Sequence, residues 1–296
     1  MQAKKELWNY GPNERVWVGK YKNSHNLPHW HDDCELIFVE KGEVDVFCDG
    51  KTYPLKTGNS MFICGGQVHY MIAKECGVAL TTLVFHYELI KRYFRGLSLN
   101  IPVLCGEYPI EETYRAVMEE LKNRKNFYRE TAENAIERLM LQIFRREELI
   151  KKPQKSETHE QFKKLLDEIS VNFEFFTLAR AAQFMNMNTS YFSRFFHATA
   201  GIPFSKYLNY VKVENAVAKI RERKFTMTEV AVECGFGTIR NFNRTFKALT
   251  GYTPTEMPVE FQFSADFINQ GMRSENPTLS DCELLESSNL DFREGN

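Results

Sequence analysis

The sequence predicts a two-domain α+β chain: an N-terminal all-β barrel or jelly roll with trailing helices, then an all-α domain with two helix-turn-helix units. Three observations predict it. Short runs rich in β-branched and aromatic residues, separated by turns, fill residues 15–87; amphipathic helical stretches follow at about 110–150; and a helical pattern repeats about 50 residues apart in the C-terminal half. A chain of 296 residues and 34.6 kDa has room for two domains, each with its own core.

We expect the N-terminal domain to span residues 1–150, with the barrel at about 15–90. Its first strands are rich in Val, Ile and Phe, and Asp49-Gly50 marks a hairpin turn. Further strands are expected at 60–63 and 78–85. Short strands at this regular spacing are typical of a barrel or a double-sheet jelly roll.

A group of histidines within this barrel has the chemistry of metal ligands. His29 and His31 lie two residues apart on a strand, so both side chains point to one face of the sheet. Glu35 and His69 add a carboxylate and a third imidazole. Such a set suits a divalent transition metal such as Zn, Mn, Fe or Ni.

Two alternatives to a metal stay open for the same four residues. Together with Trp17 they can line a pocket for a small organic effector, or they can hydrogen-bond one another and buried water in a purely structural role. Tryptophans Trp17 and Trp30 beside these polar groups favour a carbohydrate as the effector.

Two amphipathic helices and a linker are expected after the barrel. Apolar residues recur at helical spacing from Ile110 to Leu121, and again between about 130 and 150. Residues 151–158 are polar, charged and interrupted by Pro153, which is typical of an interdomain linker.

The C-terminal domain, expected at 159–258, contains a pattern that occurs twice. The paired positions are Phe192 and Phe242, Arg194 and Arg244, Phe196 and Phe246, and Gly201 and Gly251. A repeat of this kind indicates one supersecondary unit used twice. Each copy has the pattern of a helix-turn-helix unit, and a connector at about 203–222 joins them. Two such units could reach adjacent major-groove segments about 34 Å apart.

The second helix of each unit has an apolar back and a polar front. In the first unit the outward residues are Ser190, Ser193, Arg194 and His197; in the second they are Arg240, Asn241, Asn243, Arg244 and Lys247. Arginine pairs with guanine and asparagine with adenine in the major groove. We therefore expect the second unit to make more direct base contacts, and the first to depend on Arg194.

Charge and composition separate the segments further. Residues 158–258 carry 13 Lys and Arg against 9 Asp and Glu, whereas residues 259–296 carry 2 against 8. The acidic tail is expected to be disordered. Neither an apolar run of about 20 residues nor a signal-peptide core is found, and the seven cysteines are scattered. These features predict a cytoplasmic protein with reduced thiols and no membrane segment.

Residues of about 159–258 resemble the DNA-binding domain of AraC-type transcriptional regulators. The resemblance rests on Gly235-Phe236, Phe242-x-x-x-Phe246-Lys247 and Gly251-x-x-Pro254. It implies a double-stranded DNA operator, a small-molecule effector, and RNA polymerase as a further partner. It also implies that the two helices after the barrel form a homodimer contact; the alternative is that they pack only on their own barrel. The first unit is commonly described as the stronger base reader in this family, which differs from our ranking.

The barrel resembles the cupin fold, and its spacing would place the cupin metal ligands on His29, His31, Glu35 and His69. Three positions depart from the cupin motifs, because Asn23, Cys64 and Ala73 replace the usual glycine, proline and asparagine. Sensor domains of AraC-type regulators share this barrel and often keep these residues while binding an organic effector.

The leading hypothesis is a non-enzymatic, ligand-responsive transcriptional regulator. The alternative is a metal-dependent cupin enzyme fused to a DNA-binding domain, and a weaker third is an architectural DNA binder that senses nothing. Stoichiometric metal with turnover would favour the enzyme, and a tight effector would exclude the architectural protein.

Overall fold

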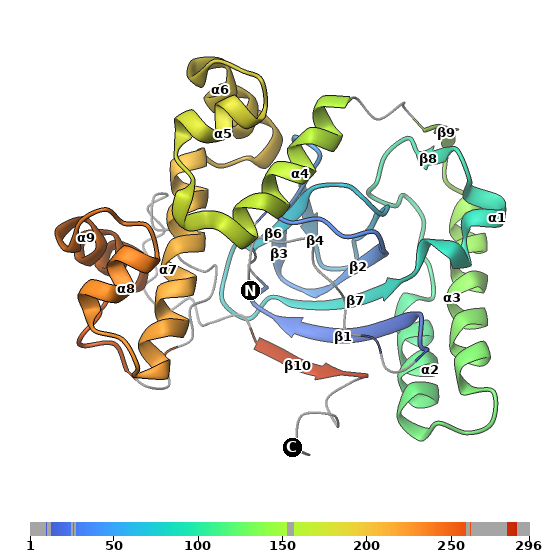
Figure 1. Ribbon diagram of the computed structural model, residues 1–296. Coiled ribbons are helices and arrows are strands. Elements are labelled where there is room, and N and C mark those ends of the chain that lie inside the picture. Colours follow the sequence, from blue (N-terminus) through green and yellow to red (C-terminus); the bar gives the residue numbers. More distant parts are fainter. Residues whose placement is uncertain are drawn as a thin grey trace.

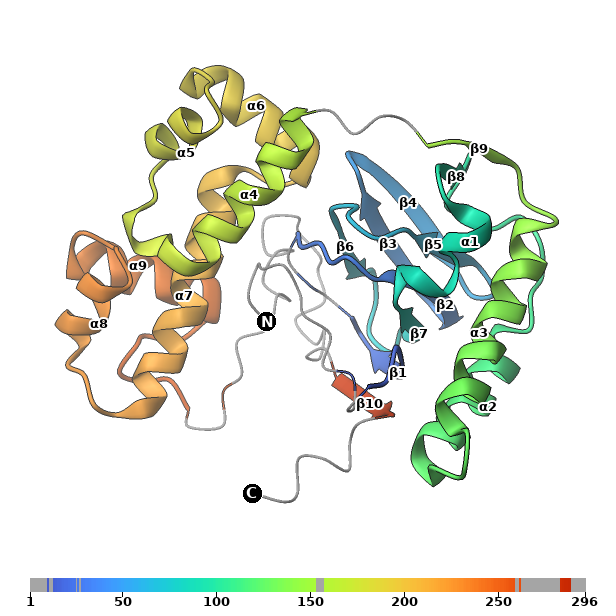
Figure 2. The ribbon, with the colours of Figure 1, turned by 45° about the vertical axis from the view of Figure 1, so that its right-hand side comes forward.

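A sheet-rich N-terminal part and a helical C-terminal part lie side by side in the computed structural model (Figures 1 and 2). The structure describes residues 10, 13–24, 26, 28–152, 157–258, 261 and 283–288. The two-domain α+β fold that the sequence predicts is confirmed, with a double sheet followed by two helix-turn-helix units.

Two antiparallel sheets form the N-terminal part. The first has the order β10-β1-β7-β2-β5, and the second has the order β4-β3-β6. Their bounds are β1 Val16–Lys22, β2 Cys34–Lys41, β3 Glu43–Cys48, β4 Lys51–Lys56, β5 Ser60–Ile63, β6 His69–Ala73 and β7 Ala79–Phe85. Inward side chains of both sheets, such as Ile37, Val46 and Met71, form one apolar cluster between them. The alternation of inward and outward residues in each strand follows from the pleat.

A helical layer covers the outer face of the five-stranded sheet. It contains η1 Tyr87–Leu89, α1 Lys91–Phe94, α2 Ile110–Asn123 and α3 Tyr128–Phe144. Outward residues of the sheet, including Leu36 and Phe85, pack into one cluster with Val117 and Ile136 of the helices. A short pair, β8 Leu97–Leu99 with β9 Leu149–Lys151, closes this part. The second expected helix therefore ends earlier than residue 150, and its last residues pair as a strand.

The C-terminal part consists of helices around a single core. Its elements are α4 Glu157–Asn172, η2 Phe173–Phe175, α5 Leu178–Phe184, α6 Thr189–Ala200, α7 Phe204–Glu222, α8 Met227–Glu233 and α9 Ile239–Thr250. Phe192, Phe196, Phe242 and Phe246 of the repeated pattern are all fully buried in this core. Of the expected linker, residues 153–156 lie outside the described residues, and the segments on both sides are regular structure.

The expectation of a disordered tail is wrong for Glu283–Ser287. These residues form β10, which pairs antiparallel with β1 at the edge of the sheet. The physical reason is the free edge of β1, whose backbone groups need partners. The Tyr114 hydroxyl of α2 also donates to Glu286 at 2.8 Å. Most other residues of the tail lie outside the described residues.

Among the described residues, none of the helices combines the length and the apolar character that a membrane span requires.

Candidate effector site and DNA-binding helices

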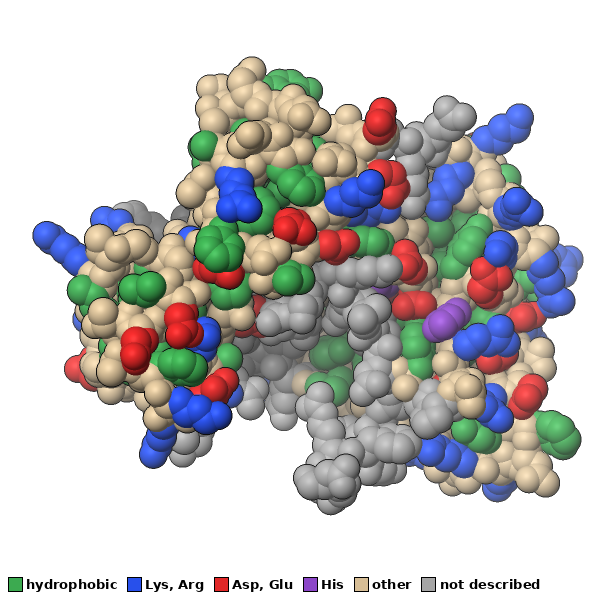
Figure 3. All heavy atoms as spheres, in the orientation of Figure 1, with side chains coloured by type: hydrophobic (Ala, Val, Ile, Leu, Met, Phe, Trp, Pro, Cys, Tyr) green, Lys and Arg blue, Asp and Glu red, His purple; other side chains and the backbone are tan. Residues whose placement is uncertain are grey.

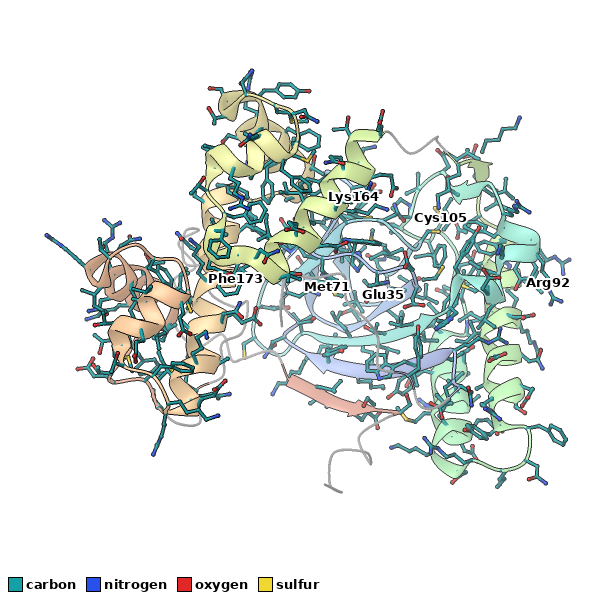
Figure 4. The ribbon with its side chains drawn as sticks, viewed as in Figure 1. Glu35, Met71, Arg92, Cys105, Lys164 and Phe173 are labelled. Carbon is teal, nitrogen blue, oxygen red and sulfur yellow. The ribbon has the colours of Figure 1, made fainter. Side chains whose placement is uncertain are left out.

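Three segments bring the four predicted ligands together inside the barrel. His29 and His69 face each other across an isolated bridge, in which each backbone N–H donates to the other's carbonyl at 3.0 and 2.9 Å. His31 follows two residues later, and Glu35 lies on β2. Figure 4 shows Glu35 in the interior of the sheet-rich part. The structure therefore brings together the four residues that the sequence analysis grouped.

The four side chains are close enough to share one ligand. One potential ligand atom from each of His29, His31, Glu35 and His69 lies within 4.8 Å of the others, and all four residues are buried. The ring centroids of His29 and His69 are 4.3 Å apart, and those of His31 and His69 are 4.9 Å apart. This is a compact polar cluster in a largely apolar interior, and we call it the His/Glu cluster.

Hydrogen bonds orient two of the imidazoles toward Glu35. The Nδ1 atoms of His31 and His69 lie 2.9 Å from the backbone carbonyls of Asp33 and Gln67. Because a carbonyl oxygen only accepts, each Nδ1 carries a proton. The opposite nitrogens, both Nε2, lie 3.3 and 3.0 Å from Oε2 of Glu35. A nitrogen lone pair and a carboxylate oxygen both accept, so a proton or a cation must lie between each Nε2 and Oε2 of Glu35.

This arrangement fits a divalent metal by its donor chemistry. Metal-ligating histidines commonly donate their other ring N–H to a backbone carbonyl, as His31 and His69 do here. Burial opposes ionisation of the Glu35 carboxyl, but hydrogen bonds from His31 and His69 outweigh it and hold its pKa below the usual value. An ionised carboxylate with imidazole nitrogens could bind Zn²⁺ or a similar ion. The same groups could equally hydrogen-bond a polar organic ligand.

Trp17 lies on the inner face of the sheet but outside the His/Glu cluster. It pairs with Val84, which in turn pairs with Glu35, so these three side chains point to the same side. Two strand spacings separate Trp17 from Glu35, which is about 10 Å. The indole folds over Gly19, where an added Cβ would lie 2.3 Å from the ring. Trp17 is buried and shares the inner face of the sheet with Glu35.

Thr82 is an inner-face residue that the sequence analysis missed. It pairs with Gly19 and with Ile37, and its side-chain oxygen is buried without a hydrogen-bond partner among the described residues. The alternation within 78–85 could have assigned it to the interior, but threonine is common in strands and gave no further signal.

Trp30 does not line the barrel interior. It lies between His29 and His31 and points to the opposite side, where it belongs to the apolar cluster of the C-terminal helices. The use of Trp30 to favour a carbohydrate is therefore wrong, because a side chain between two inward residues of an extended segment must point outward.

Asn23 explains one departure from the cupin motifs. It adopts φ 52°, in the left-handed region where glycine is usual. Its side-chain oxygen accepts from the backbone N–H groups of Gly77 and Val78 at 2.6 and 3.1 Å. Asparagine thus replaces glycine here with a compensating hydrogen bond.

The two helix-turn-helix units, α5–α6 and α8–α9, have matching ends. Asn188 caps α6 and Thr238 caps α9, each through a side-chain oxygen that accepts from the N–H three residues on. Gly201 and Gly251 end the two helices in the left-handed conformation. Local signals that the sequence carries twice therefore produce the same unit twice.

The predicted DNA-contacting residues lie on exposed faces of α6 and α9. All nine are exposed except Asn241, which is half-buried; the exposed ones are Ser190, Ser193, Arg194, His197, Arg240, Asn243, Arg244 and Lys247. Asn241 donates to the carbonyl of Phe236 at 3.2 Å and accepts from Arg244 at 3.1 Å. It is thereby engaged in holding the turn. Figure 3 shows Lys and Arg side chains projecting from the end formed by α8 and α9.

The connector helix α7 holds the turn of the second unit. Buried Lys212 donates from Nζ to the carbonyl of Gly235 at 2.6 Å. Gly235 has φ +68°, and an added Cβ would lie 2.3 Å from the Glu174 carbonyl. The turn between α8 and α9 is therefore fixed by both its backbone conformation and a buried cation.

Comparison with known proteins places both parts in one family. A family model described as AraC-like ligand binding domain matches residues 18–169, and one described as helix-turn-helix domain matches residues 181–258. The uncharacterized HTH-type transcriptional regulator YfiF of Bacillus subtilis is 20% identical over 254 residues, which cover 80% of each chain.

Two further comparisons cover very different shares of the matched chain. Uncharacterized HTH-type transcriptional regulators of Staphylococcus aureus are 27% identical over 120 residues, which is 40% of this chain but only 16% of theirs. Apo ToxT K231A from Vibrio cholerae is similar over 83% of this chain and 97% of that chain, with 12% identity and a TM-score of 0.43. Since the first family model alone covers half of the sequence, the chain belongs to the AraC family of helix-turn-helix transcriptional regulators.

Proposed function

We propose that the chain is a ligand-responsive, sequence-specific DNA-binding regulator. The observation that carries this proposal is the pair of matching units, each with a capped helix that exposes one polar face. With α6 and α9 in successive segments of the major groove, the protein would read an operator of double-stranded DNA. Phosphate contacts from the basic side chains would add affinity that does not depend on sequence.

Base reading would be stronger in the second unit. Arg240, Asn243 and Arg244 are exposed on α9, whereas α6 offers Arg194 with serines on the same face. Asn241 is less suited to a base contact than the sequence suggested, because its amide already holds the turn. Each good bidentate contact contributes roughly 1–3 kcal/mol of discrimination.

The effector would bind at the His/Glu cluster. His29, His31, Glu35 and His69 would supply the polar contacts, and Trp17 an apolar wall against which a sugar ring could stack. A divalent metal held by the same four residues would supply a Lewis-acidic centre for such a ligand. The family resemblance further suggests that the α2–α3 pair forms a homodimer contact. We further propose that the protein acts in the cytoplasm and contacts RNA polymerase.

Selection of bound fragments from random double-stranded DNA tests the regulatory function. The full chain should enrich a site with two half-motifs, and competitor DNA should not displace it readily. Ser190→Ala in the first unit should reduce the enrichment weakly, and Arg240→Ala in the second unit should reduce it strongly. Enrichment of no sequence at all, under salt conditions where the protein binds DNA, would refute sequence-specific reading.

A metal-dependent cupin enzyme is the second candidate, and the buried His/Glu cluster is the observation that favours it. Elemental analysis of the purified chain, beside a His69→Gln variant, tests metal binding. Metal in wild type but not in the variant, together with turnover of sugars or phenols, would favour the enzyme. Metal without turnover would leave the regulator as the better description.

A further inference from the structure

Part of the outer face of the small sheet, along β6 and the end of β3, is apolar and is covered by the C-terminal helices. We call this surface the docking face and define it by Trp30, Phe47, Val68, Tyr70 and Ile72. Trp30 and Val68 are buried members of the cluster that α4 to α9 form, and Ile72 packs against it. Phe47 and Tyr70 are also buried, and their rings stack with centroids 5.0 Å apart. In Figures 1 and 2, α4 and α7 lie on the side of the sheets where β6 runs.

The docking face and the His/Glu cluster lie on opposite sides of the same strands. His29 and His31 flank Trp30 in sequence, and His69 is flanked by Val68 and Tyr70. The bridge between His29 and His69 brings both segments together. Because side chains of extended segments alternate, inward ligands and outward docking residues are neighbours on one backbone. A shift of the ligand-bearing segments must therefore move the docking face.

Helix α4 rests on this face through Lys163. Its ammonium lies 4.7 Å from the ring centroid of Trp30, and the side chain is buried, with Glu160 at 2.9 Å. A cation above an indole ring that is shielded from water is a favourable contact. The first helix of the DNA-binding part is thus held directly behind the two histidines that flank Trp30.

The C-terminal end of α6 forms a second contact with the docking face. At Gly201, an added Cβ would lie 2.3 Å from the Tyr70 hydroxyl oxygen and 2.9 Å from the Phe47 ring. Nearby, the hairpin residue Gly50 approaches the Ala198 carbonyl, with an added Cβ at 3.1 Å. A larger residue at Gly201 would require the Tyr70 and Phe47 side chains to move. Recognition helix α6 therefore ends on the sensor part, while its DNA-facing residues stay exposed.

We propose that the docking face is the element through which the His/Glu cluster controls the first helix-turn-helix unit. A ligand that binds among His29, His31, Glu35 and His69 displaces the segments 29–31 and 67–70. Trp30 and Tyr70 on the other side then change how firmly α4 and α6 are held. The orientation of the first unit relative to the second changes as a result. This inference rests on the proposed effector site and adds the path by which that site acts.

Amide hydrogen exchange of the full chain, without DNA or ligand, tests the docking. Trp30→Ala should raise exchange in α4 by about tenfold relative to α9, since a buried ring and its cation contact are lost. Phe127→Ala, which truncates an exposed aromatic residue between α2 and α3, is the matched control and should change nothing in α4. If Trp30→Ala does not fold, Lys163→Met removes only the charge. If the variant that folds shows the same exchange in α4 as the wild-type protein, the proposal is overturned.

A second comparison tests the coupling itself. Glu35→Gln keeps the shape of the cluster but alters its hydrogen bonds, and it should change α4 exchange by at least about threefold, although Glu35 does not touch α4. In the double variant with Trp30→Ala and Glu35→Gln, amide exchange in α4 should equal that of Trp30→Ala alone. If Glu35→Gln does not fold, His31→Gln perturbs the same hydrogen bond from the other side.

Two results would overturn the coupling. One is that the effects of Glu35→Gln and Trp30→Ala on exchange in α4 add in the double variant. The other is that Glu35→Gln alters exchange in β2 and β6 but leaves exchange in α4 unchanged. Neither comparison uses DNA or an effector, so failure of the coupling is distinguishable from failure of the proposed function. A protein that selects no DNA sequence could still pass both comparisons, and one that selects a sequence could fail them.

Discussion

Lys212 gives the sharpest test of how the second helix-turn-helix unit is held in place. Its ammonium donates to the carbonyl of Gly235 at 2.6 Å, from a side chain that is buried on α7. Gly235 in turn lies against the backbone of Glu174, so the turn between α8 and α9 is fixed on two sides. Lys212→Met keeps the aliphatic stem and removes the donor, which leaves the Gly235 carbonyl without this partner.

We expect Lys212→Met to lower the free energy of unfolding by about 1–2 kcal/mol. A hydrogen bond to a charged group contributes roughly 1.5–3 kcal/mol. Burial lowers the pKa of Lys212, which means that the ammonium has lost hydration, and relief of that penalty in the methionine variant offsets part of the loss. For a protein of this size, each 1 kcal/mol corresponds to a fall in the unfolding midpoint of roughly 2–4 °C.

Thermal unfolding of the full chain measures this effect, with Lys212→Arg as the control. Arginine keeps a cationic donor on a long side chain, so the midpoint of this variant should stay near that of wild type. A methionine variant as stable as wild type would refute the role of the hydrogen bond. If Lys212→Met and Lys212→Arg lower the unfolding midpoint equally, the shape of the lysine side chain matters and its charge does not.

Three further outcomes follow from the structure. Arg240→Ala should weaken specific operator binding by about 1–3 kcal/mol, and more than Arg194→Ala does, in a titration of labelled operator; the opposite order would refute our ranking of the two units. Thr226→Ala removes the side-chain half of the capping box at α8, the hydroxyl oxygen that accepts from the Glu229 N–H, and should lower stability by about 1 kcal/mol in denaturant unfolding, whereas Thr228→Ala should not. Deletion of residues 283–296 uncovers the edge of β1 and should increase amide exchange in β1; unchanged exchange there would contradict the pairing with β10.

The helix-turn-helix units were predictable because their signals are local. The second helix of each unit, which the repeated pattern predicts, is observed as Thr189–Ala200 and as Ile239–Thr250. The apolar period and the glycine stops lie within each helix, so no distant residue has to be known. The His/Glu cluster was also predictable, since alternation along one strand places His29 and His31 on the same face.

Features that depend on distant partners were not predictable. Alternation alone could assign Trp30 to the side opposite the histidines, but not to a contact with Lys163, which lies 133 residues further along the chain. The tail composition indicated disorder, yet Glu283–Ser287 pair with β1 because that edge is available. The amide side chain of Asn241 is suited to a contact with adenine, which the sequence indicates. Its hydrogen bond to the Phe236 carbonyl depends on the fold of the turn and could not be predicted from the sequence.

Hydroxyl-radical footprinting of the full chain on its selected operator tests most directly whether both units read DNA. Two matched helices joined by α7 should protect two segments on one face of the duplex, about 10–10.5 base pairs apart from centre to centre. Arg240→Ala should weaken protection of one segment, and Arg194→Ala that of the other. A single protected segment, affected by only one of these substitutions, would contradict the two-unit account.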